Sequence, residues 1–178
     1  YLTRHRSRYE AYLRGYRQKK LLLLEKGLPD DDYPYSVAST WALSIEQIER
    51  TSRASAELLK LCALLQPDAI PEELFADPVP ALGAVLREAL LAQKDDAQAL
   101  DELLAPLLCY ALVQRDPDQR TLSLHRLVQQ SLLHQMTEAE EQRWAGAAVA
   151  QVSTVFPPSL FTDWTKGRRL LPQALTMF

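Results

Sequence analysis

The chain has 178 residues, of which 47% are hydrophobic and 24% charged, and its formal net charge at pH 7 is −3. This length is enough for one domain with a buried core, and the regular recurrence of apolar residues excludes a disordered chain. The weakly acidic balance argues against a domain that binds nucleic acid or a membrane through its overall charge.

The distribution of charge and the placement of the cysteines give further information about the protein and its cellular compartment. Residues 1–26 hold eight basic residues against two acidic ones, a local balance of +6, which leaves −9 for the remainder. Cys62 and Cys109 each lie in an apolar run and form no CxxC, which predicts two reduced, buried thiols in a cytoplasmic protein. The chain begins with Tyr1 and ends in mid-pattern, so we expect a segment of a longer protein.

The first third of the chain predicts helices and one boundary. Apolar residues recur at helical spacing over about 3–26, and GLPDDDYP at 27–34 then breaks regular structure. Ser44 with Gln47 forms a capping-box pattern, which predicts a short helix opening at Ser44. In SAELLKLCALL the apolar positions follow helical spacing and predict one buried face: Leu58, Leu61, Cys62 and Leu65.

Two helices and a hairpin follow. Helices are predicted at 80–92 and 96–110, the second bent or ended near Pro106. LVQR and TLSLH surround the turn DPDQ, and the alternation of Leu122 and Leu124 with polar residues predicts a hairpin with one buried face.

The last third predicts helices again. A helix from about Arg126 to Met136 follows the hairpin at once, and Thr137 with Glu140 opens a further helix that ends near Val155. Its apolar stripe is Trp144, Ala148, Val152 and Val155.

This order of elements predicts the fold class. Three helices, a two-stranded hairpin and a further helix are the order of a winged-helix domain. We therefore expect a mainly α fold: a winged-helix domain at 35–136 with one β-hairpin, an N-terminal helix before it, and C-terminal helices over 137–178.

Catalytic motifs are missing from the sequence. The five glycines are scattered, and neither GxxxxGK[ST] nor GxGxxG occurs. His5, His125 and His134 lack metal-ligand spacing, and acidic pairs such as Glu72–Glu73 are typical of solvated helix surface. We therefore predict that this segment is not an enzyme and holds no metal.

A winged helix raises the question of DNA. The helix in the recognition position carries Asp95, Asp96, Asp101 and Glu102 and no Arg or Lys. Carboxylates there would face the phosphate backbone without counterion release to offset the repulsion. A protein-packing module is therefore favoured, and a DNA-binding transcription regulator is the alternative.

Several passages carry a family resemblance. LSIEQI, LLKLCALLQPDAIPEELF and LVQRDPDQRTLSLHRLVQQSLLHQM resemble the winged-helix part of NB-ARC-type STAND ATPases, in particular bacterial ones that continue into tetratricopeptide repeats. YLTRHRSRYEAYLRGYRQKKLLLLEKG resembles the last helix of the preceding helical subdomain, and WTKGRRLLPQAL resembles the approach to the repeats. The resemblance implies the end of a helical subdomain and linker at 1–34, the winged helix at 35–136, and a connector toward a helical repeat array at 137–178.

The resemblance implies a signalling switch. In this family ADP holds the domains closed, and exchange for ATP, with a protein or other ligand on the repeats, opens and oligomerises them. The expected partner of this segment is the nucleotide-binding domain of its own chain, with no nucleic acid and no membrane. ADP or ATP with Mg²⁺ would belong to the parent ATPase, whose P-loop lies upstream, and this segment alone would bind none.

His125 is the candidate cofactor-binding residue. The family's Met-His-Asp-type motif, whose histidine contacts the nucleotide phosphate, reads Leu124-His125-Arg126 here, with arginine in place of the acid. A helix start also favours an anion, because it exposes unpaired N–H groups. Two alternatives remain open: His125 caps the backbone only, and the segment is a helical protein-interaction scaffold without nucleotide contact.

Overall fold

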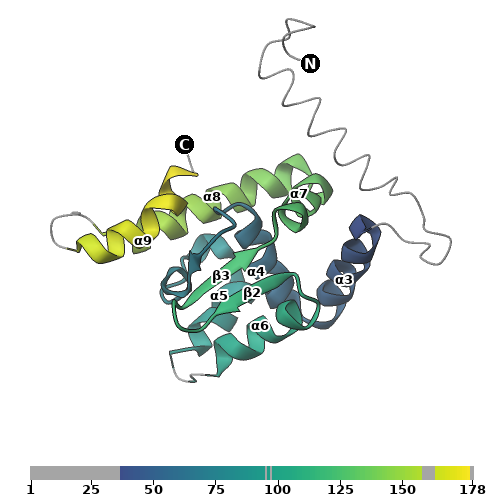
Figure 1. Cartoon of the computed structure of the whole chain (residues 1–178), viewed down its shortest axis with the longest axis horizontal. Helices are drawn as coiled ribbons and strands as arrows, with labels where there is room; N and C mark the ends of the chain where they lie inside the picture. The colour runs from purple at the N-terminus through teal and green to yellow at the C-terminus, as the bar shows by residue number, and fades with distance from the viewer. Residues whose placement is uncertain (1–36, 95, 97, 158–162, 177–178) are drawn as a thin grey trace, which may run out of the picture. The chain divides into compact units, whose positions relative to one another are not determined.

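The computed structural model describes residues 37–94, 96, 98–157 and 163–176 (Figure 1). The helix predicted at 3–26 and the boundary at 27–34 lie outside the described residues. The chain forms two compact units, Tyr1–Leu43 and Ser44–Phe178. The described part of the first unit is the beginning of α3, and all further elements belong to the second unit.

Within the described residues the chain is mainly helical, with one small sheet. The α-helices are α3 (Val37–Thr51), α4 (Arg53–Ala63), α5 (Ala84–Ala92), α6 (Ala99–Cys109), α7 (Arg126–Gln135), α8 (Glu138–Val155) and α9 (Trp164–Leu175). Two short 3₁₀ helices are η1 (Glu72–Phe75) and η2 (Pro80–Leu82). The strands are β1 (Ile70–Pro71), β2 (Val113–Asp116) and β3 (Thr121–Leu124).

The sheet and its neighbours form a winged helix. The strands are antiparallel in the order β1-β3-β2, and along the chain the α-helices and strands follow one another as α4–β1–α5–α6–β2–β3. The predicted mainly α fold with a β-hairpin is therefore confirmed. Strand β1 was not predicted: it has two residues, and Ile70 pairs with Leu122 only because the chain returns there. Its Pro71 is tolerated because β1 lies at the edge of the sheet.

Helix α4 forms the centre of the core. The predicted face of Leu58, Leu61, Cys62 and Leu65 is confirmed, since none of these residues is more than 2% exposed. α4 packs against α5, α6, α7 and α8, which gather around it in Figure 1. Burial raises the pKa of the Cys62 thiol to about 12, so this cysteine stays protonated and unreactive.

Helix α3 corrects the predicted start at Ser44. The helix is already formed at Val37 and runs through Ser44 to Thr51. A capping-box pattern marks a helix start only where the preceding residues are not helical. Here the residues before Ser44 already belong to α3. The true cap nearby is Ser52, whose hydroxyl accepts the N–H of Ser55 at 3.4 Å and opens α4.

The region 80–110 contains three further differences. Gly83, at φ 85°, divides the predicted helix at 80–92 into η2 and α5, because only glycine adopts this backbone conformation cheaply. Helix α6 runs through Pro106 to Cys109, so of the two predicted outcomes at this proline, a bend or an end, the end is wrong. Cys109 is exposed, so the predicted buried thiol there is wrong. It lies two residues after the buried Leu107, about 200° around the helix.

The predictions for α7 and α8 are confirmed. α7 begins directly after the hairpin, and in the capping box of α8 Thr137 Oγ1 accepts the Glu140 N–H at 3.3 Å. The Glu140 carboxylate in turn accepts the Thr137 N–H at 3.1 Å. The predicted stripe of α8 is buried: Trp144, Ala148, Val152 and Val155. No helix among the described residues is long and apolar enough to span a membrane.

Buried glutamines attach the C-terminal helices to the loops of the core. Gln151 of α8 accepts the Val79 N–H at 2.9 Å and donates to the carbonyls of Leu74 and Asp77 at 2.6 and 3.0 Å. Gln173 of α9 accepts the Gln66 N–H at 2.9 Å and donates to its carbonyl at 3.2 Å. Each amide thereby satisfies backbone groups that loops leave without ladder partners.

Candidate functional site

The site predicted from the sequence is centred on His125, at the joint between β3 and α7. His125 is the N-cap of α7, with an extended backbone (φ −62°, ψ 130°) and an exposed side chain. Its Nδ1 accepts the Leu127 N–H at 3.2 Å, and its carbonyl accepts the Gln129 N–H at 3.0 Å. The backbone-capping contact that the sequence left open is therefore present. A neutral imidazole that accepts at Nδ1 carries its proton at Nε2.

The end of α4 and the loop between α4 and β1 hold this joint in place. Gln129 of α7 donates to the carbonyls of Ala63 and Leu65, both at 2.9 Å. The Leu124 N–H donates to the Pro67 carbonyl at 2.8 Å. These contacts hold the end of β3 and the first turn of α7 against the same segment, so the backbone at His125 is positioned by the fold.

Arg126 stands where the resemblance has an acidic residue. Its guanidinium pairs with Asp68 at 3.0 Å, and both side chains are exposed, so the pair contributes at most about 1 kcal/mol. Asp68 lies in the same supporting loop, where nothing in the sequence marks it as a partner. A basic side chain therefore follows His125 directly, and the acid that pairs with it comes from another segment.

A second polar cluster lies under the wing, the β2–β3 hairpin. Glu72 of η1 is buried, and its carboxylate accepts from Arg115 Nε at 2.6 Å and from Arg120 Nε at 3.5 Å. Arg115 also donates to Asp101 of α6 at 2.5 Å. The hydrogen bonds to Glu72 and then Asp101 raise the pKa of Arg115. The interpretation of Glu72 as solvated surface is wrong, since its charge is matched by wing arginines far away in the sequence.

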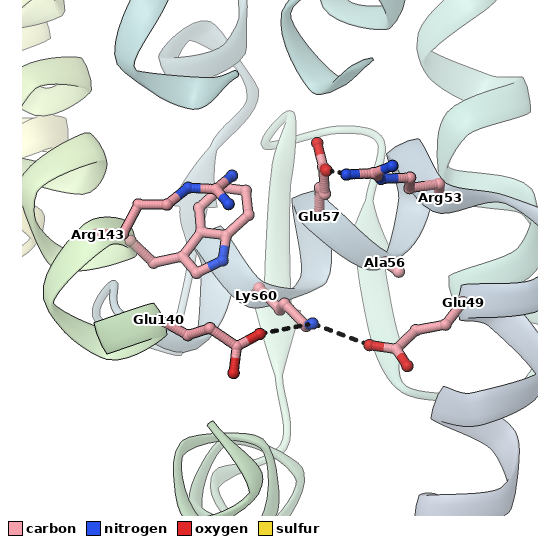
Figure 2. A pocket seen from close by; sticks show the side chains of 8 residues that line it. Glu49, Arg53, Ala56, Glu57, Lys60, Glu140 and Arg143 are labelled. Atoms are coloured by element: carbon pink, nitrogen blue, oxygen red, sulfur yellow. Dashed lines mark hydrogen bonds and ion pairs between the residues drawn. The ribbon is translucent and has the colours of Figure 1, made fainter. Parts of the chain in front are cut away.

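A charged hollow of about 250 Å³ is lined by residues of α3, α4 and α8 (Figure 2). Lys60 bridges Glu49 and Glu140 at 2.9 and 3.6 Å, and Arg53 pairs with Glu57 at 3.2 Å. Hydrogen bonds from Thr137, with a smaller contribution from Lys60, hold the pKa of Glu140 below its usual range. The hollow was not predicted, because its lining comes from helices that meet only in the fold.

The remaining wall of the hollow is aromatic. The Arg143 guanidinium lies over the Trp144 ring, 4.7 Å from its centre, and the second oxygen of Glu57 accepts the Leu86 N–H at 3.2 Å. Three acidic and three basic side chains line the hollow, so its formal charge sums to zero. Among the described residues, no three His, Cys, Asp or Glu side chains are grouped to hold a metal ion. The ion pairs of Lys60 in this hollow connect α4 to α3 and to α8.

Fold and site together define a winged-helix domain with an exposed histidine at the start of the helix that follows the wing. The profile of the family described as "Domain of unknown function (DUF7779)" matches residues 46–141, which is more than half of the chain. The chain therefore belongs to this family. No curated protein and no solved structure shows a significant match to it. The matched range includes His125, Glu72 and the whole sheet.

Proposed function

We propose that this domain is the regulatory winged-helix module of a STAND-type signalling switch that responds to ADP and ATP. It packs against the nucleotide-binding domain of its own chain, and His125 contacts the nucleotide phosphate. The observation that carries this proposal is the exposed imidazole at the first turn of α7, held in place through Nδ1. The parent ATPase would supply the nucleotide and Mg²⁺ site.

The chemistry of the joint supports a phosphate contact. With Nδ1 accepting from the backbone, the ring carries its N–H at Nε2, and it lies at a helix start, which favours negative charge. A hydrogen bond from such a donor to a charged phosphate contributes about 1.5–3 kcal/mol. This corresponds to a roughly ten- to hundredfold bias of a two-state equilibrium, which is enough for a switch.

The contacts of the wing favour a domain that packs against another protein domain over a domain that binds DNA. Both wing arginines, Arg115 and Arg120, pair with the buried Glu72. Asp101 and Glu102 are exposed on α6, the helix in the recognition position, and would repel phosphates. A protein-interaction scaffold without nucleotide contact is the second candidate, and the exposed apolar side chains of α9 favour it.

Nucleotide release from the full-length protein tests the proposal. We expect His125→Ala to increase the rate of fluorescent ADP release about tenfold or more. His125→Asp separates the two roles of the residue, because Asp caps a helix well but repels phosphate, so it should release ADP at least as fast as His125→Ala. His134→Ala, at the exposed last turn of the same helix, is the matched control. Wild-type retention in His125→Asp would reject the phosphate contact.

A further inference from the structure

Helix α9 has an inner face that is fixed to the domain. Gly167, Leu170 and Gln173 are buried, and the Gln173 amide binds the backbone of Gln66. Arg169 donates to the Gln119 carbonyl in the wing turn at 3.0 Å. Figure 1 shows α9 beside α8, at the edge of the domain. The helix is therefore a firmly held part of the surface.

The outer face of α9 carries an apolar seam. Trp164, Leu171 and Leu175 are 64%, 42% and 66% exposed, and they are three of the seven exposed large apolar side chains among the described residues. With Arg168 they follow the spacing i, i+4, i+7, i+11, which places all four on one side of a helix. This is the spacing of a coiled-coil contact line, with one cation among the apolar positions.

Arg168 gives the seam its charge. Within α9 the charged residues are Lys166, Arg168 and Arg169, and all are basic. Arg169 is engaged with the wing turn and with Glu73, whereas Arg168 makes no ion pair with any described residue. A cation within an apolar seam makes binding selective, because the residue opposite it in the partner must carry the opposite charge.

We propose that this seam, Trp164, Arg168, Leu171 and Leu175, is a docking site for an amphipathic helix of a partner protein. That helix carries apolar residues at heptad spacing and an acidic residue opposite Arg168. Helix-on-helix recognition of this kind uses anchors at the spacing observed here. The inference does not depend on nucleotide binding.

Charge argues against two other occupants. In a pair of α9 helices from two copies of the chain, the arginines at position 168 would lie opposite each other or within one turn, and like charges there are unfavourable. An anionic membrane would meet the acidic remainder of the chain, since residues 27–178 carry a balance of −9. A partner helix with an acidic flank meets neither repulsion.

Two synthetic helical peptides of about three heptads test the seam. Both have Leu at the contact positions, and one has Glu and the other Lys at the flanking positions. By fluorescence anisotropy, the intact chain should bind the Glu peptide at least about tenfold more tightly than the Lys peptide. Arg168→Glu should reverse this preference, whereas Arg50→Glu, the same charge change at an exposed residue of α3, should not. Trp164→Ala should weaken binding of the Glu peptide about tenfold or more.

Three outcomes would overturn the proposal. The first is that neither peptide binds, or that Arg168→Glu behaves like Arg50→Glu. The second is a dimer of the chain in sedimentation that Trp164→Ala removes, which would assign the seam to self-association. The third is binding to phosphatidylserine vesicles that Trp164→Ala abolishes, which would assign it to lipid.

Discussion

The wing and α9 use their arginines in opposite ways. In the wing, Arg115 and Arg120 reach the buried carboxylate of Glu72. In α9, Arg168 stays on the outer face among exposed apolar side chains. The same residue type therefore serves the fold in one region and a surface in the other. The two regions differ only in whether the fold brings a carboxylate to the arginine. Glu72 is 43 residues from Arg115 in the chain, so the sequence around Arg115 does not reveal this partner.

The largest effect is expected where the wing charge is buried. Glu72→Ala leaves two arginines without their shared carboxylate and should lower the free energy of unfolding by about 2–3 kcal/mol, somewhat below the value for a fully buried pair. Asp101→Ala removes the other partner of Arg115, but Asp101 is exposed, so the loss should stay below about 1 kcal/mol. Urea denaturation measures both. Equal losses would mean that Glu72 does not hold the wing.

Substitutions on the inner and outer faces of α9 should also differ in how far they lower the free energy of unfolding, and both effects should be smaller than that of Glu72→Ala. Gln173 is 0% exposed, and Gln173→Ala leaves the N–H and carbonyl of Gln66 unpaired, at a cost of about 1–3 kcal/mol. Trp164→Ala removes an exposed ring and should change stability by no more than about 0.5 kcal/mol. Thermal and urea unfolding of the two variants give the comparison. A costly Trp164→Ala would show that the ring belongs to the core.

Elements with a strong local period were predictable. The buried face of α4, the alternation of Leu122 and Leu124, and the Thr137–Glu140 capping box each follow from residues within a few positions of one another. β1 was missed because its pairing with β3 defines it as a strand. Cys109 was misplaced because an apolar run does not show which side of a helix faces the core.

The candidate site was predictable in its position but not in its surroundings. The change from alternating to helical spacing marks His125 as a strand-to-helix joint. Its supports come from the α4–β1 loop, through Gln129 and the Arg126–Asp68 pair, and no local pattern connects these residues. Glu72 was missed for the same reason, since its partners approach only when the wing folds over η1.

Binding of the chain to duplex DNA, titrated over a range of salt concentrations, tests most directly whether the wing serves packing. Arg120 is the informative variant, because its side chain is 74% exposed and its loss leaves Arg115 on Glu72. A packing wing predicts no sequence preference and an affinity and salt slope that Arg120→Ala leaves unchanged. Sequence-specific binding with a Kd near 10 nM, and a salt slope that Arg120→Ala reduces by about one, would contradict it.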